Sequence, residues 1–513
     1  MAGMIRAVSL EAAQHSDTGR PLRPFAARQV AVLGAALAAL LTALSGRYGY
    51  HRDELYFRVA GDHLAAGYVD QPPLTPLLAR LSTTLFGDTV MGLRVVSTLT
   101  CVAGVVVVAL IARELGGGRR AQVFAAACTA VSSVILVNGH LVSTATFDIF
   151  LWLLISLFTL RLLRTGDGRW YLAVGAAAGI GVLNKYLVGL LLFGVLVSVL
   201  VVGPRRVLRS WWPVAGALVA LALAAPNLWW QAAHGWPQLT IAVGISAEDG
   251  AENRALFVPL QFVYLSPVFV PVLVAGARRL WRDPDIRWAR PFGLAYPLLA
   301  VLVLAIGGKA YYVIPLLIVV LAAGAAPAVR WAASRRKPGA RRWALPALVL
   351  VAAAVNVVAS LPVLPPTSLN LINGMNKEQG EQVGWPELTA AVATAWRGIP
   401  AERRDQAVIF TQNYGEAGAI ARYGPEHGLP GPYSGHMSFA DWGAPPDSAT
   451  GPVVLVHYPS NRTIGRHFTD CRPVATVDNG HGLENDEQGT VVQLCAGTDA
   501  PWSAIWPDLR RYY

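Results

Sequence analysis

The feature that most constrains this chain is a succession of long apolar runs, each close to the length of helix that crosses a bilayer. Charged residues make up only 14% of the 513 residues, against about 25% in soluble domains. So apolar a chain cannot cover itself with a water-facing surface, and we predict a polytopic α-helical membrane protein. Eleven spans are predicted, at 29–46, 91–112, 121–138, 147–163, 171–183, 185–203, 211–229, 257–277, 291–307, 311–329 and 343–361.

Arginine concentrates in every second connector between these spans. The N-terminal tail and the connectors 113–120, 161–169, 204–209, 278–290 and 330–342 hold 24 of the 42 Lys and Arg residues. Basic connectors face the cytoplasm, so the N-terminus is predicted inside and, after an odd number of spans, the C-terminal region outside. The formal net charge of +11 therefore reports topology, and no basic patch with interleaved aromatic residues indicates nucleic-acid binding.

The chain divides at a proline-rich stretch that follows the last predicted span. We predict a cytoplasmic tail (1–28), a transmembrane domain (29–361) with outer loops at 47–90 and 230–256, and an extracytoplasmic α/β domain (362–513). Within this last domain, β-branched runs predict strands at 407–411, 453–457 and 491–494, and helical spacing predicts helices at 386–398 and 415–423.

Two cysteines, Cys471 and Cys495, lie in the predicted outer domain. An extracytoplasmic compartment is oxidising, which favours a disulfide between them. Two buried free thiols are the alternative.

The first outer loop begins with a short amphipathic pattern. Leu55, Val59 and Leu64 share one helical face, and Gly67 suits the end of that helix. The Pro72-Pro73 pair suits the first turn of a second helix. Such a hairpin would lie along the outer membrane surface.

Three carboxylates of this loop are candidate functional groups. Asp53 suits a general base that takes a proton from an acceptor hydroxyl, or equally an N-cap of the predicted helix. Glu54 suits a carboxylate in the first turn of that helix. Asp70 is a candidate polar group at the same interface, or the start of an Asx turn before the two prolines.

Other polar residues interrupt apolar spans on the same predicted side. Asp148 lies at the outer mouth of one span, and Lys185 lies between two others, where it either serves a site or reaches toward the interface. In a later connector, Lys309, Tyr311 and Tyr312 either hold a phosphate or form an interfacial aromatic belt.

These residues fall into recognisable motifs: Arg52-Asp53-Glu54-Leu55-Tyr56, Asp70-Gln71-Pro72-Pro73-Leu74, Asp148, and Gly308-Lys309-Ala310-Tyr311-Tyr312. Together they resemble the GT-C membrane glycosyltransferases, and more narrowly the bacterial branch of glycosyltransferase family 39, akin to protein O-mannosyltransferases and aminoarabinose transferases. Residues 412–418 and 433–436 of the outer domain also resemble motifs of the bacterial members.

The resemblance implies a GT-C fold, a polyprenyl-phosphate-linked sugar as donor, inversion at the anomeric carbon, and often a divalent metal ion (Mg, Mn or Ca). By position it makes Asp53 the catalytic base, with Glu54 beside it. It places Asp70 and Asp148 near a metal or the acceptor.

The resemblance also implies which groups bind substrate. Lys309, with Lys185, Tyr311 and Tyr312, would lie near the donor phosphate. His234 matches a recurrent segment of the second outer loop, where a substrate-binding role and an interfacial one remain open.

Two departures from the family bear on the acceptor. Gln71 stands where aminoarabinose transferases have Lys, which argues against that sugar and against lipid A. Nothing resembles the β-trefoil repeats of eukaryotic protein mannosyltransferases, so a lipid, glycan or protein acceptor remains open.

We therefore predict an enzyme of the cell membrane that transfers a sugar from a polyprenyl-phosphate donor to an acceptor hydroxyl on the outer face. The alternatives are a transporter or lipid-linked sugar flippase, and a noncatalytic sensor. Transporters commonly show internal repeats and polar residues near mid-membrane. Here the polar residues gather at one face and no repeat is visible, which favours the transferase.

Overall fold

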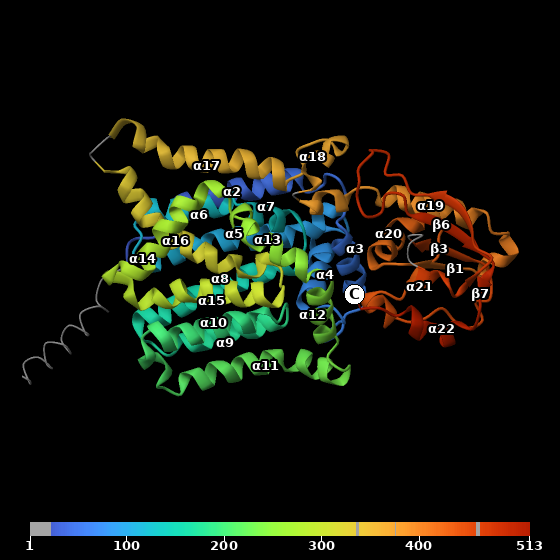
Figure 1. The fold of residues 1–513 in the computed structure, drawn as a ribbon, viewed down its shortest axis with the longest axis horizontal. Coiled ribbons are helices and arrows are strands. Elements are labelled where there is room, and N and C mark those ends of the chain that lie inside the picture. The colour runs from blue at the N-terminus through green and yellow to red at the C-terminus, as the bar shows by residue number, and fades with distance from the viewer. Residues whose placement is uncertain (1–21, 335–337, 375, 458–461, 513) are drawn as a thin grey trace, which may run out of the picture.

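The computed structural model describes residues 22–334, 338–374, 376–457 and 462–512 (Figure 1). Most of the predicted cytoplasmic tail lies outside these ranges. Within them, seven helices are long and apolar enough to cross a membrane, and two bent helix pairs would raise the number to nine. The long helices are α2 (Ala27–Leu44), α5 (Val90–Glu114), α8 (Thr144–Thr165), α11 (Trp212–Ala233), α15 (Arg290–Ile306), α16 (Ile314–Ala332) and α17 (Pro338–Ser360).

The remaining predicted spans correspond to shorter or bent helices. α9 (Trp170–Val182) and α10 (Leu187–Val202) are short apolar helices. The spans predicted as continuous at 121–138 and 257–277 are each broken. The first consists of α6 (Arg119–Ala130) and α7 (Ser133–His140), bent by 60°, and the second of α13 (Gly250–Val263) and α14 (Val270–Arg282), bent by 69°.

A buried asparagine explains how both breaks are tolerated. Breaking a helix frees backbone carbonyls, which a membrane interior cannot solvate. The Asn356 side-chain amide donates to the carbonyl of Val131 at 2.8 Å and to that of Leu265 at 3.0 Å. Because one carbonyl lies at each break, this α17 side chain satisfies both kinks at once.

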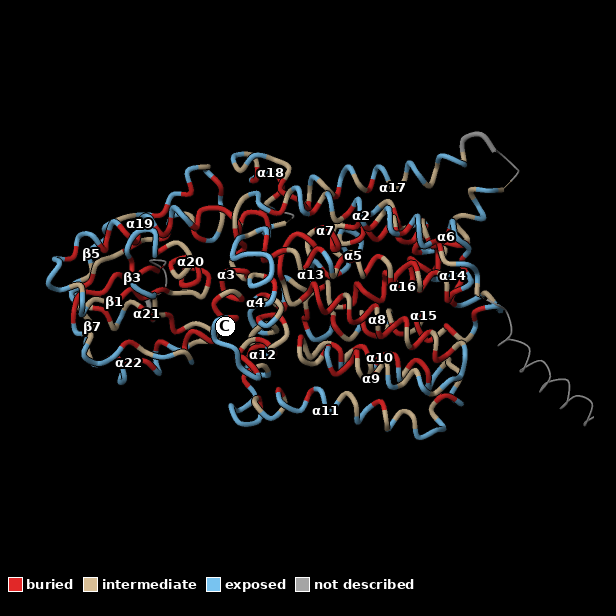
Figure 2. Tube along the Cα trace, turned by 180° about the vertical axis from the view of Figure 1, so that it is seen from behind, coloured by how far each residue is buried: buried red, intermediate tan, exposed pale blue. Residues whose placement is uncertain are grey.

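The centre of the membrane domain is formed by α5, α8 and α16. Most of α8 and α16 is buried inside the protein (Figure 2). The flanking helices α11 and α17 keep large apolar side chains exposed, such as Leu218 and Leu350. Exposed leucines on long apolar helices fit a surface that faces lipid.

Arginine-rich connectors share one end of the bundle. Arg161 and Arg164 each donate to Glu114 at 2.8 Å, and Arg279 donates to the Leu115 carbonyl at 2.6 Å. The connectors that follow α5, α8 and α14 therefore meet at one end. The C-terminal domain packs against the opposite end (Figure 1). Which of these ends faces the cytoplasm stays a prediction.

The first outer loop forms α3 (Arg52–Asp62) and α4 (Leu74–Phe86), roughly as predicted. α3 ends at Asp62 rather than near Gly67, because the Tyr68 hydroxyl donates to the carbonyls of Ala60 and His63 and folds the chain back. α3 is also not a surface helix, since α20 (Tyr414–Tyr423) of the C-terminal domain packs on it. Only α4 has the exposed apolar face expected at a membrane surface.

The second predicted outer loop, 230–256, is largely helical. α11 continues to Ala233, α12 spans Pro237–Glu248, and α13 begins at Gly250. The end of α11 supports the first outer loop, because the Asn227 amide donates to the Ala66 carbonyl at 2.9 Å.

The C-terminal domain contains the predicted α/β layer. Its main sheet has the strand order β2-β1-β3-β6-β5, in which β1 runs parallel to β2 and β3, and β6 runs antiparallel to β3 and β5. The strands are β1 (Val408–Thr411), β2 (Tyr433–Ser434), β3 (Val453–His457), β5 (Arg472–Thr476) and β6 (Val491–Cys495). The predicted helices match α19 (Trp385–Arg397) and α20, and the three predicted strands match β1, β3 and β6.

The sequence pattern does not predict β5 or the short strands β2, β4 (Phe468–Thr469) and β7 (Gly497–Thr498). β5 is an edge strand that contains Pro473 and is mostly exposed, so it lacks the apolar pattern of a central strand. Strands of two residues carry too little pattern to be distinguished from loops.

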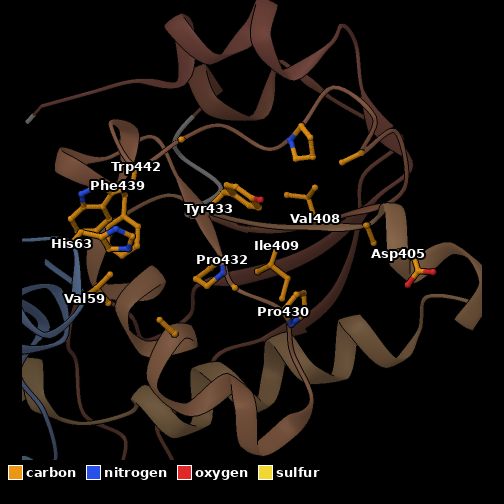
Figure 3. A pocket seen from close by; sticks show the side chains of 16 residues that line it. Val59, His63, Asp405, Val408, Ile409, Pro430, Pro432, Tyr433, Phe439 and Trp442 are labelled. Carbon is orange, nitrogen blue, oxygen red and sulfur yellow. The ribbon is translucent and has the colours of Figure 1, made fainter. Parts of the chain in front are cut away.

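A cavity of about 500 Å³ lies between α3 and the C-terminal domain. Figure 3 shows His63, Phe439 and Trp442 gathered along one part of it, with Tyr433 and Ile409 along another. The His63 and Trp442 rings stack with centroids 4.7 Å apart. These rings add to the contact between the two parts of the protein.

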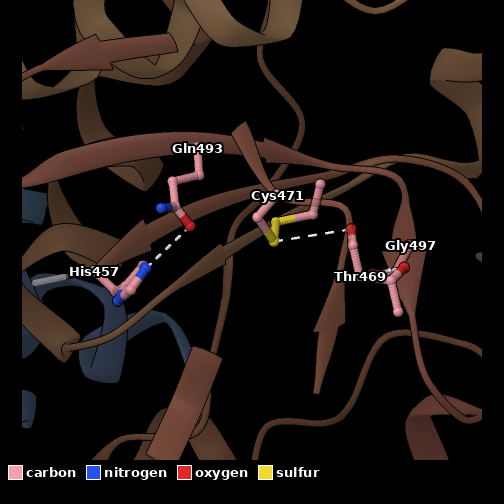
Figure 4. The surroundings of a disulfide bond; sticks show 6 residues. His457, Thr469, Cys471, Gln493 and Gly497 are labelled. Carbon is pink, nitrogen blue, oxygen red and sulfur yellow. Dashed lines mark hydrogen bonds between the residues drawn. A yellow bond between two sulfur atoms is a disulfide. The ribbon is translucent and has the colours of Figure 1, made fainter. Parts of the chain in front are cut away.

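Cys471 and Cys495 form the predicted disulfide (Figure 4). It joins the residue before β5 to the last residue of β6. The two cysteines are 24 residues apart in the sequence. Closing a loop of this size removes chain entropy from the unfolded state and contributes about 3 kcal/mol.

We expect a Cys471→Ser, Cys495→Ser double variant to have a C-terminal domain less stable by about 3 kcal/mol. Limited proteolysis of that domain under increasing denaturant measures the change. Reductant should sensitise the wild type to the same degree and leave the double variant unchanged. Unchanged protease sensitivity of the wild type in reductant would contradict the expectation.

Candidate active site

The candidate site begins at the first turn of α3. His51 is its N-cap: the Asp53 backbone N–H donates to His51 Nδ1 at 3.1 Å, and the His51 N–H donates to the Glu54 carboxylate at 2.8 Å. Asp53 is therefore not the N-cap, which was one of its two predicted roles. The capping box is formed by His51 and Glu54. The side chain of Asp53, which lies between them in the sequence, is therefore free for other contacts.

Both carboxylate oxygens of Glu54 accept hydrogen bonds in a buried network. Its side chain and that of Arg94 both have no exposed surface, and they form two hydrogen bonds of 2.9 and 2.7 Å. The Val142 N–H also donates to Glu54, at 2.9 Å. The carboxylate thus joins α3 to α5 and to the segment before α8, and it holds the first turn of α3 in place.

Asp53 lies where the membrane helices meet the C-terminal domain. The Tyr414 hydroxyl, at the start of α20, donates to Asp53 Oδ1 at 2.7 Å. The neighbouring Arg52 Nε lies 3.8 Å from the same oxygen and 3.2 Å from Glu381. The Asp53 side chain keeps 35% of its surface exposed, so a substrate can reach it.

Asp70 lies at the same junction. Pro72 has no N–H, so Asp70 cannot form the predicted Asx turn with it. Instead, Asp70 Oδ1 accepts a hydrogen bond of 2.5 Å from Tyr56. The Tyr56 ring packs on Tyr414 with centroids 5.0 Å apart. Two packed tyrosines thus connect the carboxylates of Asp53 and Asp70.

Burial raises the pKa of Asp70 to about 7, with the Tyr56 hydrogen bond opposing the shift and the Asp53 charge adding to it. Because the folded-state pKa exceeds the unfolded value of 3.8, the folded protein binds a proton that the unfolded chain releases between these pH values. The contribution of Asp70 to stability is therefore complete below about pH 4 and is lost as the pH rises through about 7.

We expect the melting temperature of the wild type, relative to Asp70→Asn, to fall as the pH rises from 4 to 7 and then to level off. Asparagine does not titrate, so the difference between the two proteins isolates residue 70. Melting curves across this pH range provide the measurement. A difference that is independent of pH would refute the assignment.

Acidic residues of the segment 377–382 complete the junction. His51 Nε2 lies 3.0 Å from Glu378, and burial raises the pKa of Glu381 to about 8 despite the opposing charges of Arg52 and His51. The sequence did not single out this segment, because nothing local relates it to a loop more than 300 residues earlier. Its acidic residues, which follow the proline-rich stretch, are the one signal it carries.

A second group of predicted residues consists of Lys185, Tyr311, Tyr312 and Asp148. Lys185 Nζ donates to the Tyr311 hydroxyl at 2.9 Å and lies over the Tyr312 ring. Asp148 is buried and within electrostatic range of Lys185. The charges of Asp148 and Asp53 both act on Tyr311, which places this group near the junction.

The other two predicted residues are Lys309 and His234. Lys309 forms an ion pair with Asp249 at 3.8 Å, and both side chains are about 40% exposed. His234 stacks on Trp230, one turn earlier in α11, with ring centroids 3.9 Å apart. His234 is exposed, and its Nδ1 lies 2.8 Å from the Trp230 carbonyl oxygen.

The predicted metal site is not supported by the arrangement of side chains. Over the residues that the structure describes, no three His, Cys, Asp or Glu side chains are grouped so that they could hold an ion. Asp70 already accepts from Tyr56, and Asp148 faces Lys185. Asp70 and Asp148 therefore do not fit a divalent cation.

The motif at residues 412–418 fastens the C-terminal domain to α3. Asn413 and Glu416 form a capping box that starts α20 at Tyr414. A Cβ at Gly415 would lie 2.6 Å from Arg52 Cγ, and one at Gly418 would lie 2.8 Å from Leu55 Cβ. Only glycine at these two positions lets α20 approach closely enough for Tyr414 to reach Asp53.

A family model described as dolichyl-phosphate-mannose-protein mannosyltransferase matches residues 70–230, a range that contains Asp70, Asp148 and Lys185. Comparison with curated proteins gives no match.

Solved structures of two transferases share the fold. ArnT from Cupriavidus metallidurans bound to undecaprenyl phosphate has a TM-score of 0.55 at 16% identity, covering 91% of this chain and 97% of that one. Its apo state gives 0.54 at 15%, covering 92% and 98%. The arabinofuranosyltransferase AftD from Mycobacteria gives 0.50 at 15%, covering 94% of this chain and 42% of that one. The predicted GT-C fold with a C-terminal sheet-containing domain is confirmed.

Proposed function

We propose that this chain is a membrane glycosyltransferase that transfers a sugar from a polyprenyl-phosphate donor to an acceptor hydroxyl on the outer face, with inversion. The observation that carries the proposal is the position of Asp53. It is a partly exposed carboxylate held by Tyr414 at the junction between the membrane helices and the outer domain. The fold shared with ArnT, whose structure contains undecaprenyl phosphate, supports a lipid-linked donor.

In this proposal the donor lipid enters from the membrane, and Asp53 acts as the general base. The acceptor oxygen attacks the anomeric carbon while its proton passes to the Asp53 carboxylate. The bond between the anomeric carbon and the phosphate oxygen breaks, and polyprenyl phosphate leaves. Tyr414 fixes the orientation of the base through its hydrogen bond to Oδ1.

Cationic groups at the mouth of the helices would stabilise the departing phosphate. The Lys185 ammonium has three N–H donors, one of which binds Tyr311, so two remain for phosphate oxygens. Lys309, paired only loosely with Asp249, could turn toward the same anion. We assign Glu54 a positioning role rather than a catalytic one, because its oxygens are bound to Arg94 and to backbone N–H groups.

Turnover of the donor separates this function from its rivals. Purified protein is incubated with a polyprenyl-phosphate sugar that is radiolabelled in the sugar, together with a membrane and cell-wall extract as acceptor source. A transferase moves the label from the lipid to an acceptor and releases polyprenyl phosphate. A flippase or a sensor would leave the lipid-linked sugar intact, which would refute the proposal.

A further inference from the structure

A cavity of about 380 Å³ lies between the start of α3 and the C-terminal domain, next to Asp53. Arg52 and Tyr414, the two residues that contact Asp53, form one side of it. The other side comes from the C-terminal domain, including His436, Asp486 and Arg511. Its volume falls in the range of about 300–1,000 Å³ typical of small-molecule sites.

Each described residue that lines this cavity carries a polar side-chain group, and the rings of Tyr414 and His436 add apolar surface. Its two guanidinium groups donate hydrogen bonds, and its two carboxylates, Asp486 and Glu487, accept them. The opposite charges offset one another, so neither an anion nor a cation is favoured. Among the described residues no aliphatic side chain lines it, which makes it unsuited to an acyl chain.

Two lining side chains keep polar atoms without a partner. His436 Nδ1 and Arg511 Nε are buried and have no hydrogen bond within the described residues. Buried polar atoms without partners are costly, and a ligand that bonds them removes the cost. Burial, with the charges of Arg511 and Arg52, lowers the pKa of His436 to about 3, so its neutral ring offers one donor and one acceptor.

We propose that this cavity binds the acceptor, and that the acceptor is a neutral glycan. Sugar hydroxyls both donate and accept hydrogen bonds, which suits a lining of mixed donors and acceptors. The packed rings of Tyr414 and His436, with centroids 5.1 Å apart, offer apolar surface for the C–H face of a sugar. The proposal rests on the proposed function, because it names the substrate that Asp53 would deprotonate.

The geometry gives the two substrates separate routes. The cavity opens to water where Asp486, 61% exposed, faces Arg52 at 3.5 Å. Lys185 and Tyr311, which we propose to hold the donor phosphate, belong instead to connectors between membrane helices. A water-soluble glycan would therefore enter through the outer domain while the lipid donor enters from the bilayer.

The test measures binding without any donor, so it does not depend on transferase activity. Full-length protein in detergent is titrated with a panel of neutral disaccharides of mannose, glucose, galactose and arabinose, and binding is followed by saturation-transfer NMR. Arg511→Gln removes a cavity guanidinium. The matched control is Arg510→Gln, because the adjacent Arg510 pairs with Asp441 at the surface instead.

We expect at least one disaccharide to bind the wild type and Arg510→Gln equally, and to bind Arg511→Gln at least tenfold more weakly. Absence of binding by any disaccharide, or equal binding by both variants, overturns the proposal. So does a serine- and threonine-containing peptide library that binds this cavity in preference to the sugars. Should Arg511→Gln fail to fold, Asp486→Ala at the exposed rim takes its place, with the same expected loss.

The two experiments together distinguish failure of the transferase proposal from failure of the glycan-acceptor proposal. If the radiolabelled donor is never consumed but sugars bind in an Arg511-dependent way, the cavity is a glycan site on a protein that is not a transferase. If the donor is consumed while no sugar binds, the transferase stands and the glycan acceptor is wrong.

Discussion

Replacing Asp53 by asparagine should lower the rate of sugar transfer about 10²–10⁴-fold, the usual effect of losing a positioned general base. Asparagine keeps the shape of the side chain and can still accept the Tyr414 hydrogen bond, so the local structure should survive. It cannot take a proton from the acceptor hydroxyl. The transfer assay with radiolabelled donor measures the loss, and binding of the donor lipid should be unchanged because Asp53 does not contact the donor phosphate in our proposal.

The matched control is Asp62→Asn, the same substitution at the other end of α3. Asp62 is about half exposed and pairs with Arg80 at the surface. Surface pairs of this kind contribute little to stability, so the control should transfer sugar at nearly the wild-type rate. Near-normal turnover by a folded Asp53→Asn protein would remove Asp53 from the role of base. Equal losses in both variants would point to damage to α3 instead.

The sequence predicts what is encoded locally. The unbroken membrane spans depend on continuous apolar runs, and β1, β3 and β6 depend on short β-branched runs, so these elements match the structure. Asp53 and Asp70 could be singled out because carboxylates beside an apolar boundary are costly unless they are paired or used. These predictions need no knowledge of what packs against each segment.

The partners of these residues could not be predicted, because they come from distant parts of the chain. Tyr414 lies 361 residues from Asp53, and Arg94 lies 40 residues from Glu54. Asp53 was an equal candidate for the N-cap because Asp is a far more common cap than His, yet His51 holds that position. The choice between the two depends on Glu54, whose burial against Arg94 fixes where α3 begins.

The same dependence on distant partners explains the broken spans. Runs 121–138 and 257–277 look continuous because their apolar residues continue across each break. Asn356, on a helix about 90 residues beyond the second break, stabilises both by bonding to one carbonyl at each of them. A single asparagine in the last predicted span gives no local sign of which backbone groups it satisfies.

Replacing Arg94 by methionine should destabilise the membrane domain by about 3–5 kcal/mol, because it leaves the Glu54 carboxylate buried without a counter-charge. Arg94 also donates to the carbonyls of Ser45 and Gly49, at 2.6 and 2.8 Å, so the start of α3 would lose two further attachments. Thermal unfolding in detergent should show a large fall in melting temperature, and the transfer rate should fall with it as Asp53 loses its fixed position.

The double variant Arg94→Met, Glu54→Gln distinguishes a buried charge from lost packing. A neutral amide at residue 54 no longer needs the guanidinium, and its oxygen can still accept from the N–H groups of His51 and Val142. If the uncompensated charge dominates, the double variant should be more stable than Arg94→Met alone, since removing both charges costs far less than removing one. If the double variant is no more stable, the destabilisation comes from the lost carbonyl contacts, and the ion pair is not what fixes the first turn of α3.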